Sequence, residues 1–281
     1  MDLWYILQAG ILGIVQGLTE FLPISSTGHL IIVSQLLGFP QDAFTSMFLV
    51  VIQLASIFAI LIIFFGRIVN LLSGMFHGEK AAWRFFGLWV LGCIPAVIAG
   101  LLFDDFIESH LLSVPTVALA LALGGVLMIY AERRVAPKAR TLEMEEMTWQ
   151  QSLIVGLFQC LALWPGFSRS ASTITGGWFA GLRTKASADY SFFLAIPMMF
   201  GASGYSLVKF FQRTKTAQAV MGPNQIGALI LGCIMSFVVA LLVVRAFLNF
   251  LHRHRLEGFA WYRIGLAVVL VILMLTGLVS L

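Results

Sequence analysis

Apolar positions are gathered into six long runs and two interrupted runs. Each long run provides roughly the 20 apolar residues that a helix needs to cross a bilayer. The sequence therefore predicts an all-α, polytopic membrane protein with six transmembrane helices. The predicted spans are 44–66, 85–104, 113–131, 188–210, 225–248 and 262–281.

The two interrupted runs are 3–38 and 150–182, and each contains a proline followed by a cluster of hydroxyl residues. Each run predicts two short helices joined by a turn, and neither helix is long enough to cross a bilayer alone. A re-entrant hairpin of this kind is stable at membrane depth only where protein or a watery cavity surrounds the turn.

The two halves of the chain share an internal repeat. Four residues of the first interrupted run recur 143 positions later: Gly13, Gln16, Leu18 and Ser25 as Gly156, Gln159, Leu161 and Ser168. The segment 91–94 (Leu-Gly-Cys-Ile) recurs at 231–234. Each half then holds one hairpin and three spans. This odd number of spans inverts the second copy and predicts an inverted-topology repeat whose hairpins meet near the midplane.

This division gives a single membrane domain, 1–281, with repeat one at 1–131, a linker at 132–147 and repeat two at 148–281. Thr148 and Gln151 have the spacing of a capping box, which would start the second hairpin.

The composition agrees with a membrane protein. The chain has 281 residues, of which 60% are hydrophobic and 11% charged, whereas soluble domains have about 25% charged residues. No basic stretch or small-residue cleavage site follows Met1, so we expect no cleaved signal peptide. The three cysteines, Cys93, Cys160 and Cys233, show neither metal-ligand spacing nor a disulfide framework.

Basic residues predict the orientation, because cytoplasmic loops retain Lys and Arg. One set of loops contains 13 basic residues, against 3 in the other set. The larger set comprises Arg67, Lys80, Arg84, Arg133, Arg134, Lys138, Arg140, Arg183, Lys185, Arg245, Arg253, Arg255 and Arg263, and the smaller comprises Lys209, Arg213 and Lys215. The larger set is predicted to be cytoplasmic. Both termini then lie outside. The first hairpin enters the membrane from outside, and the second hairpin enters it from the cytoplasm.

The first break carries acid–base candidates. Gln16 and Glu20 are four residues apart and share one helix face. Pro23 is expected to end the first helix, and Ser25, Ser26 and Thr27 are possible N-caps of the next helix, at 28–37, with His29 in its first turn. An ionisable group at membrane depth is a functional candidate by default, although a carboxyl group reaching toward the membrane surface is the alternative for Glu20.

The second break carries an anion-binding pattern. Pro165 and Gly166 interrupt the chain, and Ser168, Ser170 and Ser172 can cap a helix that begins near 171. Helix N-termini bind anions through free N–H groups, and Arg169 can bind phosphate oxygens with two parallel hydrogen bonds. Two such termini facing each other predict a site for a multiply charged oxyanion.

The two breaks have diverged at matched positions: Glu20, Ser26 and His29 correspond to Leu163, Arg169 and Ser172. The first half would therefore supply acid–base chemistry and the second half the anion clamp. For most of the serines, capping alone is the favoured role. For Gln53 and Ser56, hydrogen bonding between helices is favoured over a place in the cavity, and Asp189 is expected to pair with Arg183 or Lys185.

Residues 16–29, Gln-x-x-x-Glu-Phe-Leu-Pro-Ile-Ser-Ser-Thr-Gly-His, and 165–173, Pro-Gly-Phe-Ser-Arg-Ser-Ala-Ser-Thr, closely resemble the two motifs of the undecaprenyl-pyrophosphate phosphatase family called BacA or UppP. The resemblance covers essentially the whole chain, including Ala195-Ile-Pro-Met-Met. The first position of the acidic motif is often Glu in that family and is Gln16 here. Glu20 is therefore the only charged residue of this motif that could bind a metal ion.

The resemblance implies hydrolysis of the C55 isoprenoid diphosphate to the monophosphate, which recycles the lipid carrier for peptidoglycan synthesis and confers bacitracin resistance. It implies a divalent cation, Mg²⁺ or Ca²⁺, and a site in the bacterial inner membrane that opens toward the periplasm. The expected catalytic residues are Glu20, Ser26, His29 and Arg169, with Glu20 and Gln16 as metal ligands. Gln16, Ser25, Thr27, Ser168, Ser170 and Thr173 are expected to bind substrate, and the expected partners are this lipid, membrane lipids and a second copy of the chain in a homodimer.

Two catalytic schemes remain open. In one, Ser26 is the nucleophile and His29 the nearby acid or base; in the other, His29 activates water and Ser26 only binds substrate. A transporter or lipid flippase is the alternative function, because inverted repeats with broken helices are typical of transporters. A phosphatase of the PAP2 type is excluded, because its motif requires a His where this chain has Thr175.

Overall fold

The computed structural model describes residues 2–214, 221–251 and 253–279, and Lys215 and His252 lie outside these residues. The described part is helical, with one isolated backbone bridge between Thr141 and Leu182. Its six long apolar helices are sufficient in length and hydropathy to cross a membrane, which confirms that prediction. They are α3 (Ala43–Ile63), α5 (Lys80–Phe106), α6 (Val114–Arg134), α9 (Thr184–Thr214), α10 (Pro223–Leu251) and α11 (Glu257–Leu275).

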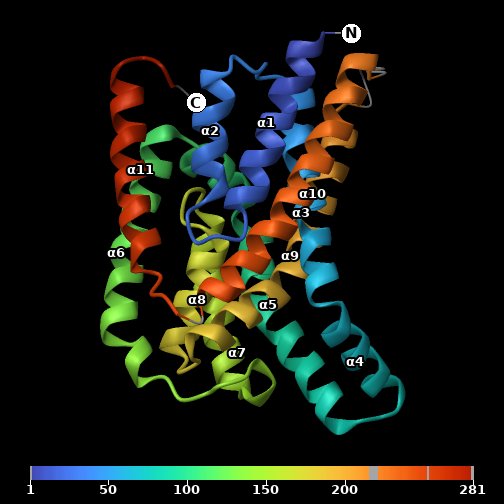
Figure 1. Cartoon of the computed structure of the whole chain (residues 1–281), viewed down its shortest axis with the longest axis vertical. Helices are drawn as coiled ribbons and strands as arrows, with labels where there is room; N and C mark the ends of the chain where they lie inside the picture. The colour runs from blue at the N-terminus through green and yellow to red at the C-terminus, as the bar shows by residue number, and fades with distance from the viewer. Residues whose placement is uncertain (1, 215–220, 252, 280–281) are drawn as a thin grey trace.

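Shorter helices form where the apolar runs are interrupted. The first interrupted run forms α1 (Leu3–Thr19) and α2 (Ser26–Leu36), and the second forms α7 (Trp149–Gln159), the 3₁₀ turn η4 (Cys160–Leu163) and α8 (Arg169–Phe179). In Figure 1, α1 and α2 occupy one end of the molecule and α7 and α8 the other. The remaining elements are α4 (Phe65–Phe76), η1 (Ile107–Leu111), η2 (Ala136–Lys138) and η3 (Met144–Glu146).

The local boundaries differ from the predicted ones by a few residues. The helix before Pro23 ends at Thr19, and α2 begins at Ser26. In the second hairpin α8 begins at Arg169, with Ser168 as its N-cap. The predicted capping box is confirmed, since the backbone N–H of Thr148 donates to Gln151 Oε1 at 2.8 Å and the backbone N–H of Gln151 to Thr148 Oγ1 at 3.4 Å.

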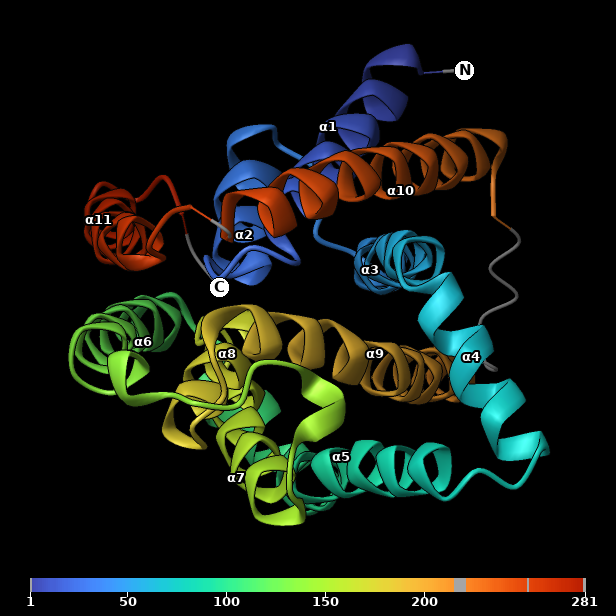
Figure 2. The ribbon, with the colours of Figure 1, turned by 60° about the horizontal axis from the view of Figure 1, so that its bottom comes forward.

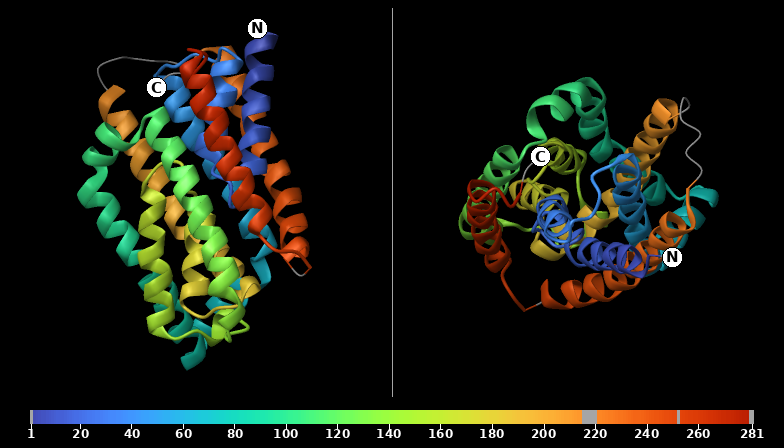
Figure 3. Two further views of the ribbon diagram at one scale, coloured as in Figure 1. Left: turned by 90° about the vertical axis from the view of Figure 1, so that its left-hand side faces the viewer. Right: turned by 90° about the horizontal axis from the view of Figure 1, so that it is seen from above.

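The short helices α1 and α7 each pack against a long helix from the other half of the chain. Helix α1 lies along α10, α7 lies along α5, and α6 pairs with α11 (Figures 2 and 3). Glycine allows the first two pairs to approach closely. A Cβ added to Gly13 would lie 2.3 Å from the carbonyl oxygen of Gly232, and one added to Gly156 would lie 2.6 Å from that of Gly92.

The two turns between short helices have matching backbones. Ser25 and Ser168, which precede α2 and α8, have φ angles of 68° and 70°. They are the non-glycine residues with positive φ in the described part of the chain. Such angles are sterically unfavourable for L-residues and are retained where the surrounding structure holds them.

Two predicted placements of charged residues are wrong. Arg263 lies within α11 and is fully buried, not in a loop. Asp189 pairs with Arg67, at 2.8 Å between Oδ2 and Nη1, while Lys185 pairs with Glu143. The corrected partner lies in α4, and its ion pair with Asp189 joins α4 to α9.

Candidate functional site

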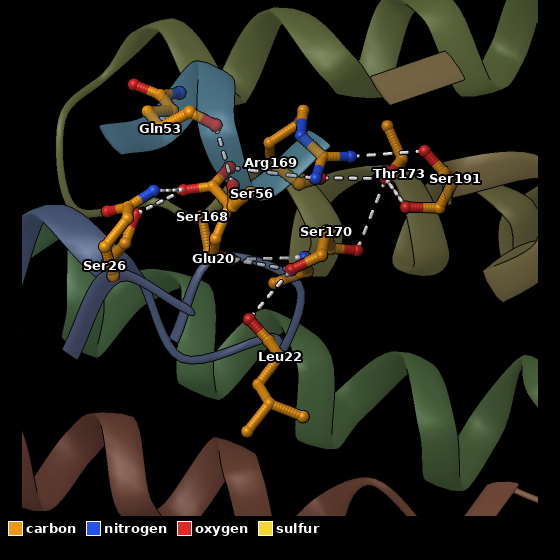
Figure 4. Close-up of polar contacts among 12 residues, drawn as sticks. Glu20, Leu22, Ser26, Gln53, Ser56, Ser168, Arg169, Ser170, Thr173 and Ser191 are labelled. Carbon is orange, nitrogen blue, oxygen red and sulfur yellow. Dashed lines mark hydrogen bonds and ion pairs between the residues drawn. The ribbon is translucent and has the colours of Figure 1, made fainter. Parts of the chain in front are cut away.

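The end of α1 supplies a carboxylate with two donors on one oxygen. Gln16 Nε2 donates to Glu20 Oε2 at 2.9 Å, and Ser26 Oγ donates to the same oxygen at 2.7 Å (Figure 4). Gln16 and Glu20 are one helical turn apart, and the turn after α1 returns Ser26 to them. Glu20 is buried at the C-terminal end of α1, where the helix dipole disfavours negative charge. The carboxylate is therefore held there by specific partners.

Arg169, the first residue of α8, faces this carboxylate. Its Nη2 lies 3.8 Å from Glu20 Oε1, and its Nη1 donates to the backbone oxygen of Ser191 at 3.1 Å (Figure 4). Its side chain is 13% exposed. Among the described residues, the buried Nε and Nη2 of Arg169 have no hydrogen-bond partner. Nη2 has an ion-pair contact with Glu20 but no hydrogen bond, so both nitrogens keep the capacity to donate to an oxyanion.

Hydroxyl groups hold the second turn in place. Ser168 Oγ accepts from the backbone N–H of Ala171 at 3.4 Å, so it is the N-cap among the three serines that the sequence offered. Ser170 Oγ donates to the backbone oxygen of Leu22 at 2.9 Å and so joins the two hairpins. Thr173 Oγ1 shares a 2.6 Å hydrogen bond with Ser191 Oγ.

A cavity of about 840 Å³ lies between the two turns and is lined by residues from both. The first hairpin contributes Gln16, Glu20, Ser25, Ser26 and Thr27, and the second contributes Pro165, Gly166, Ser168 and Arg169. Gln53 on α3 also lines it. Ser170, Thr173 and His29 are outside its lining set, so their contacts support the walls.

His29 points to a different partner from the one that its spacing predicted. Its Nδ1 lies 2.7 Å from the backbone oxygen of Ser25, and its Nε2 lies 2.7 Å from the hydroxyl of Tyr262. The two rings are stacked, with centroids 5.5 Å apart. The hydrogen-bond partner of Ser26 is Glu20 and not His29.

Gln53 and Ser56 do not form the expected bond between helices in the described structure. Ser56 is fully buried and its Oγ donates to the backbone oxygen of Gln53 at 2.7 Å, within α3. Gln53 instead lines the cavity.

The chain matches the model of the family described as bacitracin resistance protein BacA over residues 9–269. The chain belongs to this family. It is 45% identical over 275 residues to an undecaprenyl-diphosphatase of Clostridium tetani, covering 98% of each chain. It is also 42% identical over 280 residues to undecaprenyl-diphosphatase 2 of Rhodospirillum rubrum, covering 100% of this chain and 99% of the relative. An undecaprenyl-diphosphatase of Pseudomonas putida is 45% identical over 264 residues, which is 94% of this chain and 92% of the relative.

Membership of the BacA family and the six long apolar helices together make this chain a multi-pass membrane protein. Large apolar side chains on the outer surfaces of these helices, such as Leu102 and Leu242, are exposed in the isolated molecule. Lipid would cover them.

The oxygen donors at the cavity are of the kind that bind a hard divalent cation. Glu20 offers carboxylate oxygens and Gln16 a neutral carbonyl oxygen, and oxygen ligands are those that Mg²⁺ and Ca²⁺ prefer. No group of three or more His, Cys, Asp or Glu side chains that could hold a metal occurs within the described residues. Phosphate oxygens and water would have to complete the coordination, as is common for Mg²⁺.

Three residues with site contacts were not identified from the sequence: Ser191, Tyr262 and Arg263. Ser191 and Tyr262 are distant along the chain from both motifs and carry no local signal. Arg263 did carry one, because it is a cation inside an apolar run.

Proposed function

We propose that this chain hydrolyses undecaprenyl diphosphate to undecaprenyl phosphate and inorganic phosphate. One observation carries the proposal: Arg169 of the second hairpin and the Glu20–Ser26 pair of the first line the same cavity. Among the described residues, Nε and Nη2 of Arg169 have no hydrogen-bond partner there. The names of the relatives indicate the same activity. The prenyl chain would run out among the apolar helices.

The diphosphate would bind between the N-termini of α2 and α8. Within the described contacts, Ser25 forms no side-chain cap on α2, so N–H groups of the first turn are free for phosphate oxygens. Thr27 and Ser168 line the same space. Arg169 would stabilise the negative charge that develops during phosphoryl transfer.

Ser26 would act as the nucleophile, with Glu20 as its base. Ser26 Oγ donates a hydrogen bond to Glu20 Oε2 at 2.7 Å, which is the geometry from which a base can activate a nucleophile. Its oxygen would attack the terminal phosphorus, undecaprenyl phosphate would leave, and Glu20 would hold the proton. Water would then attack the phosphorus of the phosphoserine, and the proton held by Glu20 would return to Ser26 Oγ as the P–O bond breaks. Inorganic phosphate would leave with the hydroxyl and the proton of the water, and the Glu20 carboxylate would be restored. His29, which bonds to Ser25 and Tyr262, would position this turn rather than take the Ser26 proton.

A divalent cation, Mg²⁺ or Ca²⁺, is part of the proposal, with Glu20 and Gln16 as its protein ligands. When bound, such an ion neutralises phosphate charge. The hydrolysis would regenerate the lipid carrier for peptidoglycan synthesis, and it would confer bacitracin resistance, which the description of the family also names.

We also propose that the chain is an inverted-topology repeat with two re-entrant hairpins. Helices α1 and α7 are repeat equivalents, as are α10 and α5, and the pairs α1–α10 and α7–α5 both occur. The close contacts Gly13–Gly232 and Gly156–Gly92 are equivalent as well. The inner-membrane location, the cavity opening to the periplasm and a homodimer remain predictions.

The test is phosphate release from C55 diphosphate by the purified chain in detergent, where no gradient can drive transport. We expect release by the wild type, its loss with a chelator, and a fall in kcat of about 100- to 1,000-fold in Arg169→Ala. Arg134→Ala, which removes an exposed arginine at the end of α6, is the matched control and should keep full activity.

Ser26→Ala should also abolish release, and the wild type should yield a trapped phosphoserine at position 26. Release without this intermediate would favour water as the nucleophile. If the wild type releases no phosphate but moves lipid when a gradient is present, the flippase function replaces the proposed enzyme function.

A further inference from the structure

Arg263 is a buried cation that the proposed reaction does not use. It lies in the second turn of α11 and has no exposed surface. No ion pair between Arg263 and an acidic side chain occurs in the part of the chain that the structure describes. A charge in this setting is costly, so its contacts are expected to have a purpose.

The contacts of Arg263 are to backbone oxygens of the second break. Its Nη2 donates to the oxygen of Phe167 at 2.7 Å and lies 3.5 Å from the oxygens of Gly166 and Ala120. The guanidinium carbon also lies 5.8 Å from the centre of the Phe167 ring. One side chain thus joins α11 and α6 to the turn that leads into α8.

These carbonyl groups need an external donor. The hydrogen-bond ladder of α8 begins when Ser168 oxygen accepts from the N–H of Ser172 at 3.0 Å. Gly166 and Phe167 precede that first acceptor, so the helix does not satisfy their oxygens. Buried backbone oxygens are nearly always paired, and a charged donor forms the stronger bond.

The turn held in this way leads directly into the anion-binding residues. Ser168 has the unfavourable φ of 70°, and such a conformation persists only where the surroundings fix it. Ser168 and Arg169 line the cavity, whereas Arg263 and Phe167 do not. Arg263 therefore lies behind the wall that carries the clamp.

We propose that Arg263 is a positioning residue: it fixes the turn 165–168 and thereby aims Arg169 and Ser168 at the diphosphate without touching it. The inference rests on the proposed function for its effect on catalysis. Its effect on the turn does not depend on that function.

Two substitutions from different helices test the same guanidinium. Arg263→Met removes the donor. Gly124→Ala on α6 keeps every charge, but its new Cβ would lie 2.0 Å from Nη2 of Arg263. The clashing atom is the far end of a flexible side chain, so this variant should fold and should displace the guanidinium. Gly265→Ala on α11 is the control, because a Cβ there meets no atom within 4 Å.

The first readout is kinetic. Arg263→Met and Gly124→Ala should each lower kcat by about 100-fold, the size of effect that misplacement of a catalytic group produces. Arg263→Lys should recover part of the loss, and Gly265→Ala should match the wild type. In an Arg169→Ala background, Arg263→Met should lower kcat less than threefold, because Arg263 acts on kcat through Arg169, which is already absent.

The second readout is amide hydrogen exchange of the full chain in detergent, which needs no activity. Exchange in 164–172 should rise at least tenfold in Arg263→Met and Gly124→Ala. Exchange in α4, residues 65–76, should stay unchanged and serves as the internal reference, because α4 packs against α3 and α5.

Unchanged exchange in 164–172, together with wild-type kcat in Gly124→Ala, would overturn the inference. A full 100-fold fall in kcat when Arg263→Met is added to Arg169→Ala would also overturn it. If the wild type releases no phosphate, the proposed function fails, and the exchange measurement still decides the role of Arg263 in the turn.

Discussion

At the scale of single residues, the site depends on two serines held in conformations that L-residues avoid. Ser25 and Ser168 occupy equivalent places before α2 and α8, and both have φ near 70°. His29 contacts the backbone oxygen of Ser25, while Arg263 contacts the peptide before Ser168. Each of the two serines therefore lies in a turn whose backbone oxygen is hydrogen-bonded to a nearby side chain.

The strain at Ser25 predicts that glycine is more stable than alanine at this position, which is the reverse of their order within a helix. Ser25→Gly should be more stable than Ser25→Ala by about 1 kcal/mol, because a left-handed conformation costs an L-residue roughly that amount. The measurement is thermal unfolding of both variants in the same detergent. At exposed Ser73 within α4, the order should reverse, since glycine is less favourable than alanine in a helix. The same order at both positions would show that Ser25 is unstrained.

At the scale of elements, glycine sets how closely the short helices lie against their long partners. Gly13 of α1 faces the backbone of Gly232 on α10, and Gly156 of α7 faces that of Gly92 on α5. Small residues permit this close approach between helices in membranes. The two contacts support the hairpins that bring Glu20 and Arg169 together, with 3.8 Å between Oε1 and Nη2.

Enlarging either glycine should separate a hairpin from its support. Gly13→Ala and Gly156→Ala place a Cβ against backbone that has no side chain to move, so each should destabilise the protein by about 1–3 kcal/mol. Thermal unfolding measures the loss. Gly87→Ala on α5, where the new Cβ would meet nothing within 4 Å, is the matched control. A melting temperature for Gly13→Ala equal to that of the control would contradict the close packing.

At the scale of the whole molecule, charge separates the two ends. Figure 1 shows both termini at one end and α4 at the other. Arg67 on α4 pairs with Asp189 and approaches Glu143 and Glu145 of the 132–147 segment. The basic residues of this region are those from which the sequence predicted the cytoplasmic side, and this orientation stays a prediction.

Thiol labelling in intact cells tests this orientation. In a variant whose three cysteines are replaced by serine, Asp105→Cys should react with a membrane-impermeant reagent, because Asp105 is exposed at the predicted outer end. Lys138→Cys, exposed at the predicted inner end, should react only after the membrane is permeabilised. The opposite pattern would reverse the proposed orientation and direct the cavity to the cytoplasm.

The sequence by itself determined the long apolar helices, the two breaks and the residue types beside them, because hydrophobic runs, proline and capping residues act over one or two turns. It also determined the family, since two ordered motifs are local patterns. The pairing of Ser26 with Glu20, the pairing of His29 with Tyr262 and the interior place of Arg263 were decided only by the tertiary structure. Each of these depends on where the chain turns or on packing between helices, and spacing along the chain cannot specify such contacts.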